Sequence, residues 1–446
     1  MYDSITMRRK RLISRCAVLL FISIAIIPFL WAAGLAHPFE LVREAANRNN
    51  FLPVWLEFRS HEGEYLASPE LRLNYLAAAS WVNAYLGEYR SALGLAARTR
   101  TPQSVVDNPD LRRSLENYQA VDALEAIAAA TRNRQVVMIN EEHRDSSHRA
   151  FTAELLPILR DQGFRYLAAE AFGPEIQSAR YPKVGREYTD DPVFGDMIRR
   201  AIDLGFTLVP YESPSTCSAA ELKEFNTKGF GAIAGNSCME GRELGQAQNL
   251  AKFIKTHPGA KLLVHAGGAR IAKEDSPFGY LMAWNFRELT KIDPLSIDQI
   301  QMSESDAEQP DYTFIAAKYA DRPAPFVLRS KTGFFVPETS EGLDVVVIHP
   351  LARYEHGRPA WLSTGGWRKP RLIAQLPAYQ AAVPQLRSAG TTLLQVFFAT
   401  DEPDAVPVDQ FLISDPLKPA ALMLPDGKFR LVVIDRAGKV ITGFNL

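Results

Sequence analysis

The sequence has few cysteines, almost no net charge and only one long apolar run, and each of these shortages excludes a class of protein. Only 3 of the 446 residues are cysteine, and no CxxC or Cys/His spacing indicates structural zinc. Lys and Arg number 50 against 51 Asp and Glu, so no basic field marks a nucleic-acid-binding protein. A single long apolar run excludes a polytopic membrane protein. With 47% hydrophobic residues, the chain has the composition of a folded globular protein.

The long apolar run extends from Cys16 to Ala36 and follows the basic residues Arg8, Arg9, Lys10, Arg11 and Arg15. Such a basic segment, an apolar segment and the small residues Gly34 and Ala36 are typical of a secretory signal peptide that is cut after about Ala36. The alternative is an uncleaved anchor in the inner membrane, since about 20 apolar residues can just span a bilayer. Both interpretations predict an exported protein, periplasmic or extracellular, that meets the membrane only through this segment.

Two cysteines, Cys217 and Cys238, lie beyond the N-terminal segment. In an oxidising compartment this pair predicts one disulfide, which closes a loop of about 20 residues and contributes roughly 3 kcal/mol. The alternative is two independent buried thiols. Without residues 1–36 the chain has 45 basic and 50 acidic residues, so the exported form is mildly acidic.

Hydrophobic periodicity divides the remainder of the chain into three regions. Residues 37–118 are expected to form a helical cap, with a helix from Leu71 to Leu93 that starts at Ser68-Pro69, and a loop over residues 99–108. Residues 119–352 alternate short apolar strands with amphipathic helices, which predicts an α/β fold: a mostly parallel central sheet with helices on both faces. The expected strands are 135–140, 164–170, 207–212, 261–265, 295–302 and 343–349, and the expected helices are 121–132, 147–161, 191–204, 242–256 and 279–290.

The third region, residues 353–446, contains period-2 apolar runs separated by turn sequences such as Pro425-Asp-Gly427. This pattern predicts a small β-rich region at the C-terminus, built as a β-sandwich. The alternative is a set of extra strands added to the main sheet.

Ionisable residues follow the predicted strands, at the edge where open parallel sheets bind ligands. Glu141 and His143 come directly after the first strand, and the alternation of side chains in extended chain gives them a common direction. His148 falls in the first turn of the next helix, where the helix dipole keeps an imidazole neutral and able to act as a base or ligand. The ends of the next three strands carry Glu170, Tyr211 with Glu212, and His265. We therefore expect a functional cleft at this edge.

The series Glu141-Glu142-His143, with His148 five residues later, resembles the Gly-Glu-x-His-x4-His opening of ChaN-like haem-binding uptake proteins, which are relatives of erythromycin esterases and of the Tiki/TraB group. Glu170, the stretch from Arg242 to Asn249, and Val264-His265-Ala-Gly-Gly268 match later motifs in order. The resemblance covers about residues 121–301. It implies an α/β sheet with a Glu/His site that hydrolyses substrates in some members and binds haem or metal in others.

Two positions depart from the family pattern. Asn140 stands in place of a glycine, and Arg270 stands in place of a histidine in the fourth motif. If that histidine is essential, the protein has kept the cleft and lost the reaction. Arg270 could instead hold an anionic group of the substrate, because a guanidinium binds carboxylate or phosphate through two parallel hydrogen bonds.

The leading hypothesis is an exported hydrolase that acts on an ester, lactone or amide bond of a small-molecule or peptide substrate. His143 or His265 would activate water, with Glu141 or Glu170 as the orienting or basic partner. The full set of expected catalytic residues is Glu141, His143, His148, Glu170 and His265, and the expected substrate-binding residues are Tyr211, Glu212, Arg242 and Arg270.

Three other hypotheses stay open at this point. A divalent metal held by Glu141, His143 and His265 is a variant of the hydrolase, because imidazole and carboxylate ligands suit catalytic zinc or manganese. A haem- or iron-binding protein would use a histidine or Tyr211 as axial ligand. An envelope protein with an inert cleft is the last alternative.

Overall fold

The structure is a computed structural model that describes residues 34–99, 109–178, 180–185, 187–215, 217–218, 220–221, 237–274, 279–304, 310–337, 340 and 342–446. The expected N-terminal leader lies outside the described residues, apart from its last three positions. Among the helices that are described, none is both long and apolar enough to cross a membrane.

The central element is a sheet of six parallel strands in the order β4-β3-β5-β2-β6-β8. The predicted α/β fold is confirmed, and each strand lies within or overlaps a segment expected to be one. The strands are β2 (Val136–Glu141), β3 (Tyr166–Ala169), β4 (Thr207–Pro210), β5 (Leu262–Gly267), β6 (Leu295–Asp298) and β8 (Val345–Val346).

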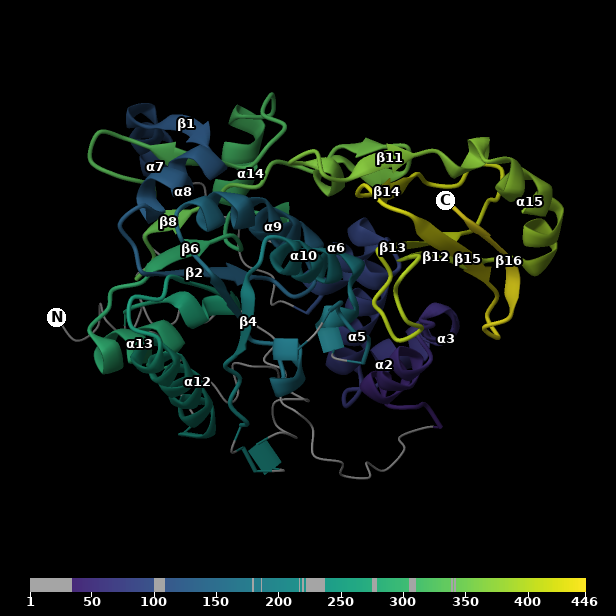
Figure 1. The fold of residues 1–446 in the computed structure, drawn as a ribbon, viewed down its shortest axis with the longest axis horizontal. Helices are drawn as coiled ribbons and strands as arrows, with labels where there is room; N and C mark the ends of the chain where they lie inside the picture. The colour runs from purple at the N-terminus through teal and green to yellow at the C-terminus, as the bar shows by residue number, and fades with distance from the viewer. Residues whose placement is uncertain are drawn as a thin grey trace.

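Helices cover both faces of this sheet (Figure 1). Side chains alternate along β2, so Val137 and Ile139 join one core while Val136 and Met138 join another. The first core is shared with α8 (Ala123–Thr131), α9 (Ser146–Asp161) and α10 (Pro192–Asp203). The second is shared with α12 (Ser237–Thr256) and α13 (Met282–Thr290). Helix α12 begins five residues before the expected start.

The N-terminal region is helical as predicted, but its expected long helix is two helices. Gly87 separates α5 from α6 with a φ of +76°, and a Cβ there would lie 3.1 Å from the Cβ of Phe411. Ser68 does not start α5; its hydroxyl accepts a hydrogen bond from the Leu71 amide, one residue before the helix. Most of the expected loop at 99–108 lies outside the described residues. The helices are α2 (Pro38–Asn47), α3 (Leu52–Ser60), α4 (Glu62–Ala67), α5 (Arg72–Tyr85), α6 (Tyr89–Ala97) and α7 (Pro109–Ser114).

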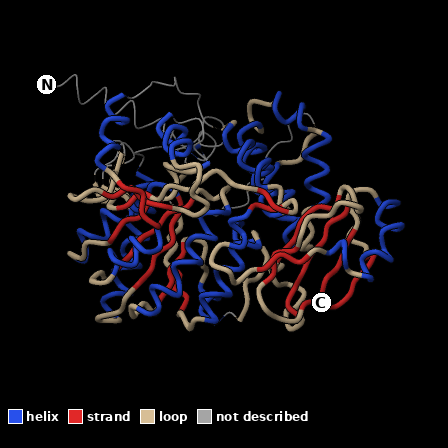
Figure 2. Tube along the Cα trace, turned by 90° about the horizontal axis from the view of Figure 1, so that it is seen from above, coloured by secondary structure: helices blue, strands red, loops and turns tan. Residues whose placement is uncertain are grey.

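The C-terminal region forms sheets of its own, so the alternative of strands added to the main sheet is wrong. An antiparallel sheet has the order β13-β12-β15-β16, and a helix that the sequence analysis missed, α15 (Pro377–Ala389), packs on one of its faces. Leu393 on the other face joins the core of the N-terminal helices. The two large sheets lie in separate halves of the molecule (Figure 2). The strands are β11 (Lys369–Arg371), β12 (Thr392–Phe398), β13 (Asp409–Ile413), β14 (Leu422–Leu424), β15 (Phe429–Ile434) and β16 (Val440–Asn445).

Smaller elements complete the fold. Strand β1 pairs antiparallel with β7, and β9 with β10. Helix α8 begins after Asp122, whose carboxylate accepts the amide of Glu125 as an N-cap. These elements are β1 (Gln119–Asp122), α14 (Pro310–Lys318), β7 (Phe326–Arg329), β9 (Tyr354–Glu355) and β10 (Arg358–Pro359).

Candidate functional site

The site lies at the carboxyl ends of three neighbouring strands, where the sequence predicted a cleft. Glu141 is the last residue of β2, and it pairs in register with Gly267 of β5. Ala169 of β3 pairs with His265, whose carbonyl accepts the amide of Glu170 at 3.2 Å. Glu141 and His265, which are 124 positions apart in the chain, are therefore neighbours because parallel strands end together at one edge.

Glu141 is the centre of the first half of the site. One carboxylate oxygen accepts Nδ1 of His143 at 2.7 Å, and the other accepts Nε2 of His265 at 2.8 Å. The guanidinium of Arg149 donates to both oxygens, at 2.8 and 3.1 Å. Burial alone would raise the pKa of Glu141, but the Arg149 charge and the two imidazoles outweigh it and hold the pKa well below its usual value. Glu141 is therefore an ionised acceptor that orients both rings.

Arg149 is a part of the site that the sequence analysis missed. Its Nη1 donates to Asp191 at 2.6 Å, and the same carboxylate oxygen accepts the hydroxyl of Ser146. The guanidinium also lies over the rings of Tyr188 and Phe194, at 5.4 and 5.3 Å. An arginine inside an amphipathic helix has no sequence signature that separates it from a surface arginine, so only the fold reveals this role.

Glu170 is the centre of the second half. Its Oε1 accepts Nη2 of Arg242 at 2.8 Å, and its Oε2 accepts the amide of Gly267 at 2.8 Å. Arg242 also donates to both carboxylate oxygens of Glu212, at 3.1 and 2.6 Å. Burial opposes ionisation of Glu170, but Arg270 and Arg242 lower its pKa to about 2. Among the described residues, Nη1 of Arg242 has no hydrogen-bond acceptor, although this side chain is almost fully buried.

The two halves meet at Gly267. A side chain there would place its Cβ 2.5 Å from Nε2 of His143 and 2.9 Å from Oε2 of Glu170, so both side chains pack closely against this glycine. Glycine is required here because any larger residue would displace the imidazole or the carboxylate. His143 thus presents one nitrogen to Glu141 and packs with the other against Gly267, close to Glu170.

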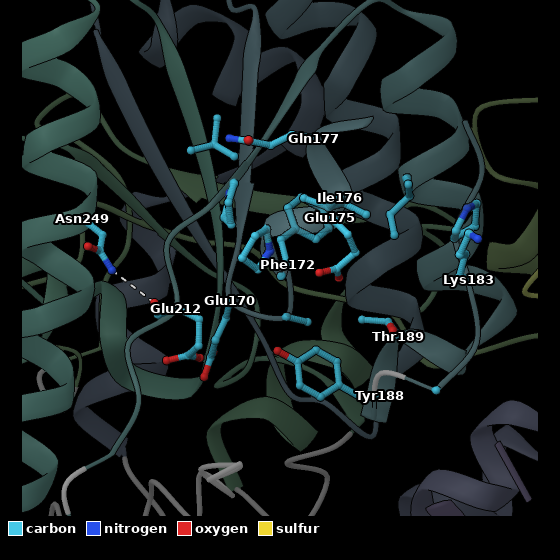
Figure 3. Close-up of a pocket in the computed structure, with 18 of the residues that line it drawn as sticks. Glu170, Phe172, Glu175, Ile176, Gln177, Lys183, Tyr188, Thr189, Glu212 and Asn249 are labelled. Carbon is cyan, nitrogen blue, oxygen red and sulfur yellow. Dashed lines mark hydrogen bonds between the residues drawn. The ribbon is translucent and has the colours of Figure 1, made fainter. Parts of the chain in front are cut away.

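A cavity of about 1340 Å³ opens next to this pair, and Glu170, Glu212 and Arg242 line it. Tyr188 also lines it, and its ring stacks on His143 with centroids 4.0 Å apart. The Tyr188 hydroxyl points toward the two carboxylates (Figure 3). The other walls mix apolar side chains, including Phe172, Ile176, Val209 and Phe253, with polar and charged ones. The cavity therefore has an ionic group at one side and mixed apolar and polar walls elsewhere.

His148 was expected among the catalytic residues, but the structure places it in a different group. Its Nδ1 accepts the amide of Glu142 at 3.0 Å, and its Nε2 lies 3.5 Å from Asp145. The ring lies 5.1 Å from that of His349. Burial lowers the pKa of His148 to about 3, so the ring is neutral as predicted, but it does not line the cavity.

Tyr211 and Arg270 are also placed differently from their expected substrate-binding roles. Tyr211 is buried, and its hydroxyl donates to the carbonyl of His265 at 3.3 Å. Arg270 donates to the carbonyl of Gly267 at 2.9 Å and lies 3.1 Å from Glu243 and 3.4 Å from Glu170. Because neither side chain lines the cavity, Arg270 supports Glu170 and does not reach a substrate anion. Glu212 and Arg242 do line it, and their substrate-binding role stays a prediction.

The residues expected to hold a metal ion or a haem are not arranged to do so. The charge of Arg149 lies on the carboxylate of Glu141, and in the part of the chain that the structure describes no three His, Cys, Asp or Glu residues are arranged to hold a metal ion. The axial ligand expected for haem was a histidine or Tyr211, and such a ligand must contact the iron directly. Neither Tyr211 nor any described histidine lines the cavity.

The predicted disulfide between Cys217 and Cys238 is present, with the two Cα atoms 4.7 Å apart. It joins the segment that follows Glu212 to the first turn of α12, the helix that carries Arg242. The disulfide therefore links the two chain segments that form the Glu212–Arg242 ion pair.

Comparison with models of known families, with curated proteins and with solved structures finds no significant match to this chain. The resemblance to ChaN-like proteins and erythromycin esterases stays a prediction.

Proposed function

We propose that the protein is an exported hydrolase that cleaves an ester, lactone or amide bond of a small molecule or peptide bound in the cavity beside Glu170. One observation carries the proposal: Glu141 accepts Nδ1–H of His143, and the opposite nitrogen of the same ring lies at Gly267 close to Oε2 of Glu170, a residue that lines the cavity. His143 itself does not line the cavity, so it would act on the substrate through a water molecule. A carboxylate that fixes the tautomer of an imidazole leaves Nε2 as the base.

The reaction begins with a water molecule between Nε2 of His143 and Glu170. Nε2 accepts a proton from the water as its oxygen forms a bond to the carbonyl carbon of the substrate. The imidazolium that results is stabilised by Glu141 and Glu170, both of which are ionised. When the carbonyl–heteroatom bond breaks, Nε2 returns the proton to the leaving alkoxide or amine. The products are the carboxylic acid and the alcohol or amine.

Arg242 is the group that receives the carbonyl oxygen of the substrate. Its Nε and Nη2 are occupied by Glu212 and Glu170, whereas Nη1 has no acceptor among the described residues although the side chain lines the cavity. A buried donor without an acceptor is costly. Nη1 is itself buried, so Arg242 must turn toward the cavity before an oxygen of the substrate can satisfy this donor. Negative charge that develops on the carbonyl oxygen would be stabilised there.

Export is part of the same proposal. It is supported by the leader-like pattern of residues 1–36 and by the disulfide, because disulfides persist in oxidising compartments.

The experiment compares hydrolysis of nitrophenyl esters and of simple lactones by the wild type, His143→Ala and His61→Ala. We expect His143→Ala to lower kcat/KM by about 10²–10⁴-fold, the usual contribution of a positioned general base. His61 is partly exposed between α3 and α4, so its replacement is the matched control and is expected to change kcat/KM less than about twofold.

Equal activity of the two variants, with unchanged circular dichroism, would overturn the proposal. A chelator is expected to leave the wild-type rate unchanged, because Arg149 occupies the carboxylate that a metal would need.

A further inference from the structure

One wall of the cavity is a short segment without helix or long strand. Residues 180–185, here named the wall segment, all line the cavity. They belong to the region between β3 and α10, in which the described regular elements are two short 3-10 helices, Pro174–Ser178 and Glu187–Asp190. The position of this wall therefore depends on what packs behind it.

The wall segment is bound by the C-terminal region. The β12–β13 loop, residues 399–408, runs antiparallel to it: the amide of Val184 donates to the carbonyl of Asp404, and the amide of Val406 donates to the carbonyl of Pro182, both at 2.9 Å. The carboxylate of Asp404 adds two further contacts. It accepts the hydroxyl of Tyr181 at 2.9 Å and lies 2.8 Å from Nζ of Lys183.

The β12–β13 loop is itself fixed from behind. Nη2 of Arg199, on α10, donates to the carbonyl of Val406 at 2.6 Å and to Asp401 at 2.8 Å. The side-chain amide of Asn49, beyond the end of α2, donates to the carbonyl of Ala405 at 3.0 Å. Ala405 and Val406 are fully buried. The loop is thus a rigid support, because the α/β region and the N-terminal helices both hold it.

We propose that Asp404 is a positioning residue that sets substrate specificity: through the β12–β13 loop, the C-terminal region fixes the wall segment and with it the width of the substrate cavity. The proposal rests on the proposed function for its substrate, and it assigns a role to a region that the catalytic groups do not explain. The wall segment lines the cavity and carries none of the proposed catalytic groups, so its position affects the binding of bulky acyl groups more than the chemistry at His143.

The experiment uses the full chain with Asp404→Ala, and Asp426→Ala as its control. Asp426 lies in the same C-terminal region, is exposed and pairs with Lys369 at 3.2 Å, so its replacement removes a comparable ion pair away from the cavity. Two readouts are measured: hydrogen exchange of peptides that cover the wall segment, and KM and kcat for a short acetyl ester and a bulky aromatic ester.

We expect Asp404→Ala to accelerate exchange of the wall segment by about threefold to tenfold, because two hydrogen-bonding contacts are lost. KM for the bulky ester should rise by about the same factor, while its kcat stays nearly unchanged. Both KM and kcat for the acetyl ester should also stay nearly unchanged. Asp426→Ala should change none of these. Unchanged exchange in Asp404→Ala, or faster exchange with unchanged KM for the bulky ester, would overturn the proposal. If exchange accelerates but the wild type hydrolyses no ester, the proposed function fails together with the specificity role, while the structural support by Asp404 stands.

Discussion

Single carboxylates in this protein have very different electrostatic surroundings. Glu141 and Glu170 are buried in contact with guanidinium groups, which hold their pKa values below the usual range. Glu154 on α9 is also buried, close to Gly365. Burial and, to a smaller extent, the charge of Asp122 raise its pKa, and together they outweigh the lowering by Arg200. Its pKa is therefore raised to about 8. Among these three buried carboxylates, the direct guanidinium contacts of Glu141 and Glu170 account for the difference in pKa.

Glu154 predicts a loss of stability at alkaline pH. A carboxyl whose folded pKa is about 8 holds a proton that the unfolded chain has already released above about 4.5, so its contribution is full below that pH and is lost as pH rises to about 8. We expect Glu154→Gln to abolish this loss. The free energy of unfolding of the variant, relative to that of the wild type, should therefore increase by roughly 2–5 kcal/mol from pH 5 to pH 9. Denaturant unfolding at both pH values measures it, with the exposed Glu44→Gln as control; parallel pH profiles of the wild type and Glu154→Gln would contradict it.

At the scale of elements, side chains on one face of α12 form hydrogen bonds to the residues that follow β4. Arg242, Gln246 and Asn249 are spaced so that they lie along one face of the helix. Arg242 and Gln246 donate to the carboxylate of Glu212, and Asn249 donates to its carbonyl and to that of Tyr211. The disulfide then joins the first turn of the same helix to Cys217, five residues beyond Glu212. Helix and strand end thus form one unit beside the cavity.

This arrangement predicts an effect of breaking the disulfide. Replacing both Cys217 and Cys238 by Ser should lower the free energy of unfolding by about 3 kcal/mol, the loop-entropy value for a closed loop of this size. KM should also rise, since Glu212 and Arg242 lose a covalent constraint between their segments. Denaturant unfolding and ester kinetics measure the two effects. A variant with unchanged unfolding free energy, compared with wild type in the absence of reductant, would contradict the prediction.

At the scale of the whole molecule, the positions of the strands could be predicted from the sequence, but the pairing of one strand with another could not. The runs that became β2 to β6 and β8 were recognisable because apolar patterning is local, and so was the convergence of Glu141, Glu170 and His265 at one edge. The order β4-β3-β5-β2-β6-β8 could not be derived, because periodicity says nothing about which strands pair. For the same reason Arg149 and Tyr188 were missed: each acts on a residue that another element carries.

The C-terminal region shows the same limit more strongly. Its strands were recognisable from period-2 runs, but α15 was missed, and nothing local relates Asp404 to Lys183, which lies more than 200 residues earlier in the chain. Contacts of this kind arise from the packing of three regions on one another, so they become visible only in the folded molecule.

Chemical rescue tests the central claim, that His143 is the base beside Glu170, most directly. His143→Ala leaves a gap between Glu141 and Tyr188, in which free imidazole can take the place of the lost ring. Ester hydrolysis by this variant is measured against imidazole concentration, after correction for the rate in imidazole alone. We predict a saturable increase in rate that follows the neutral form of imidazole as pH is varied. A rate that does not rise above the correction at any imidazole concentration would contradict the account.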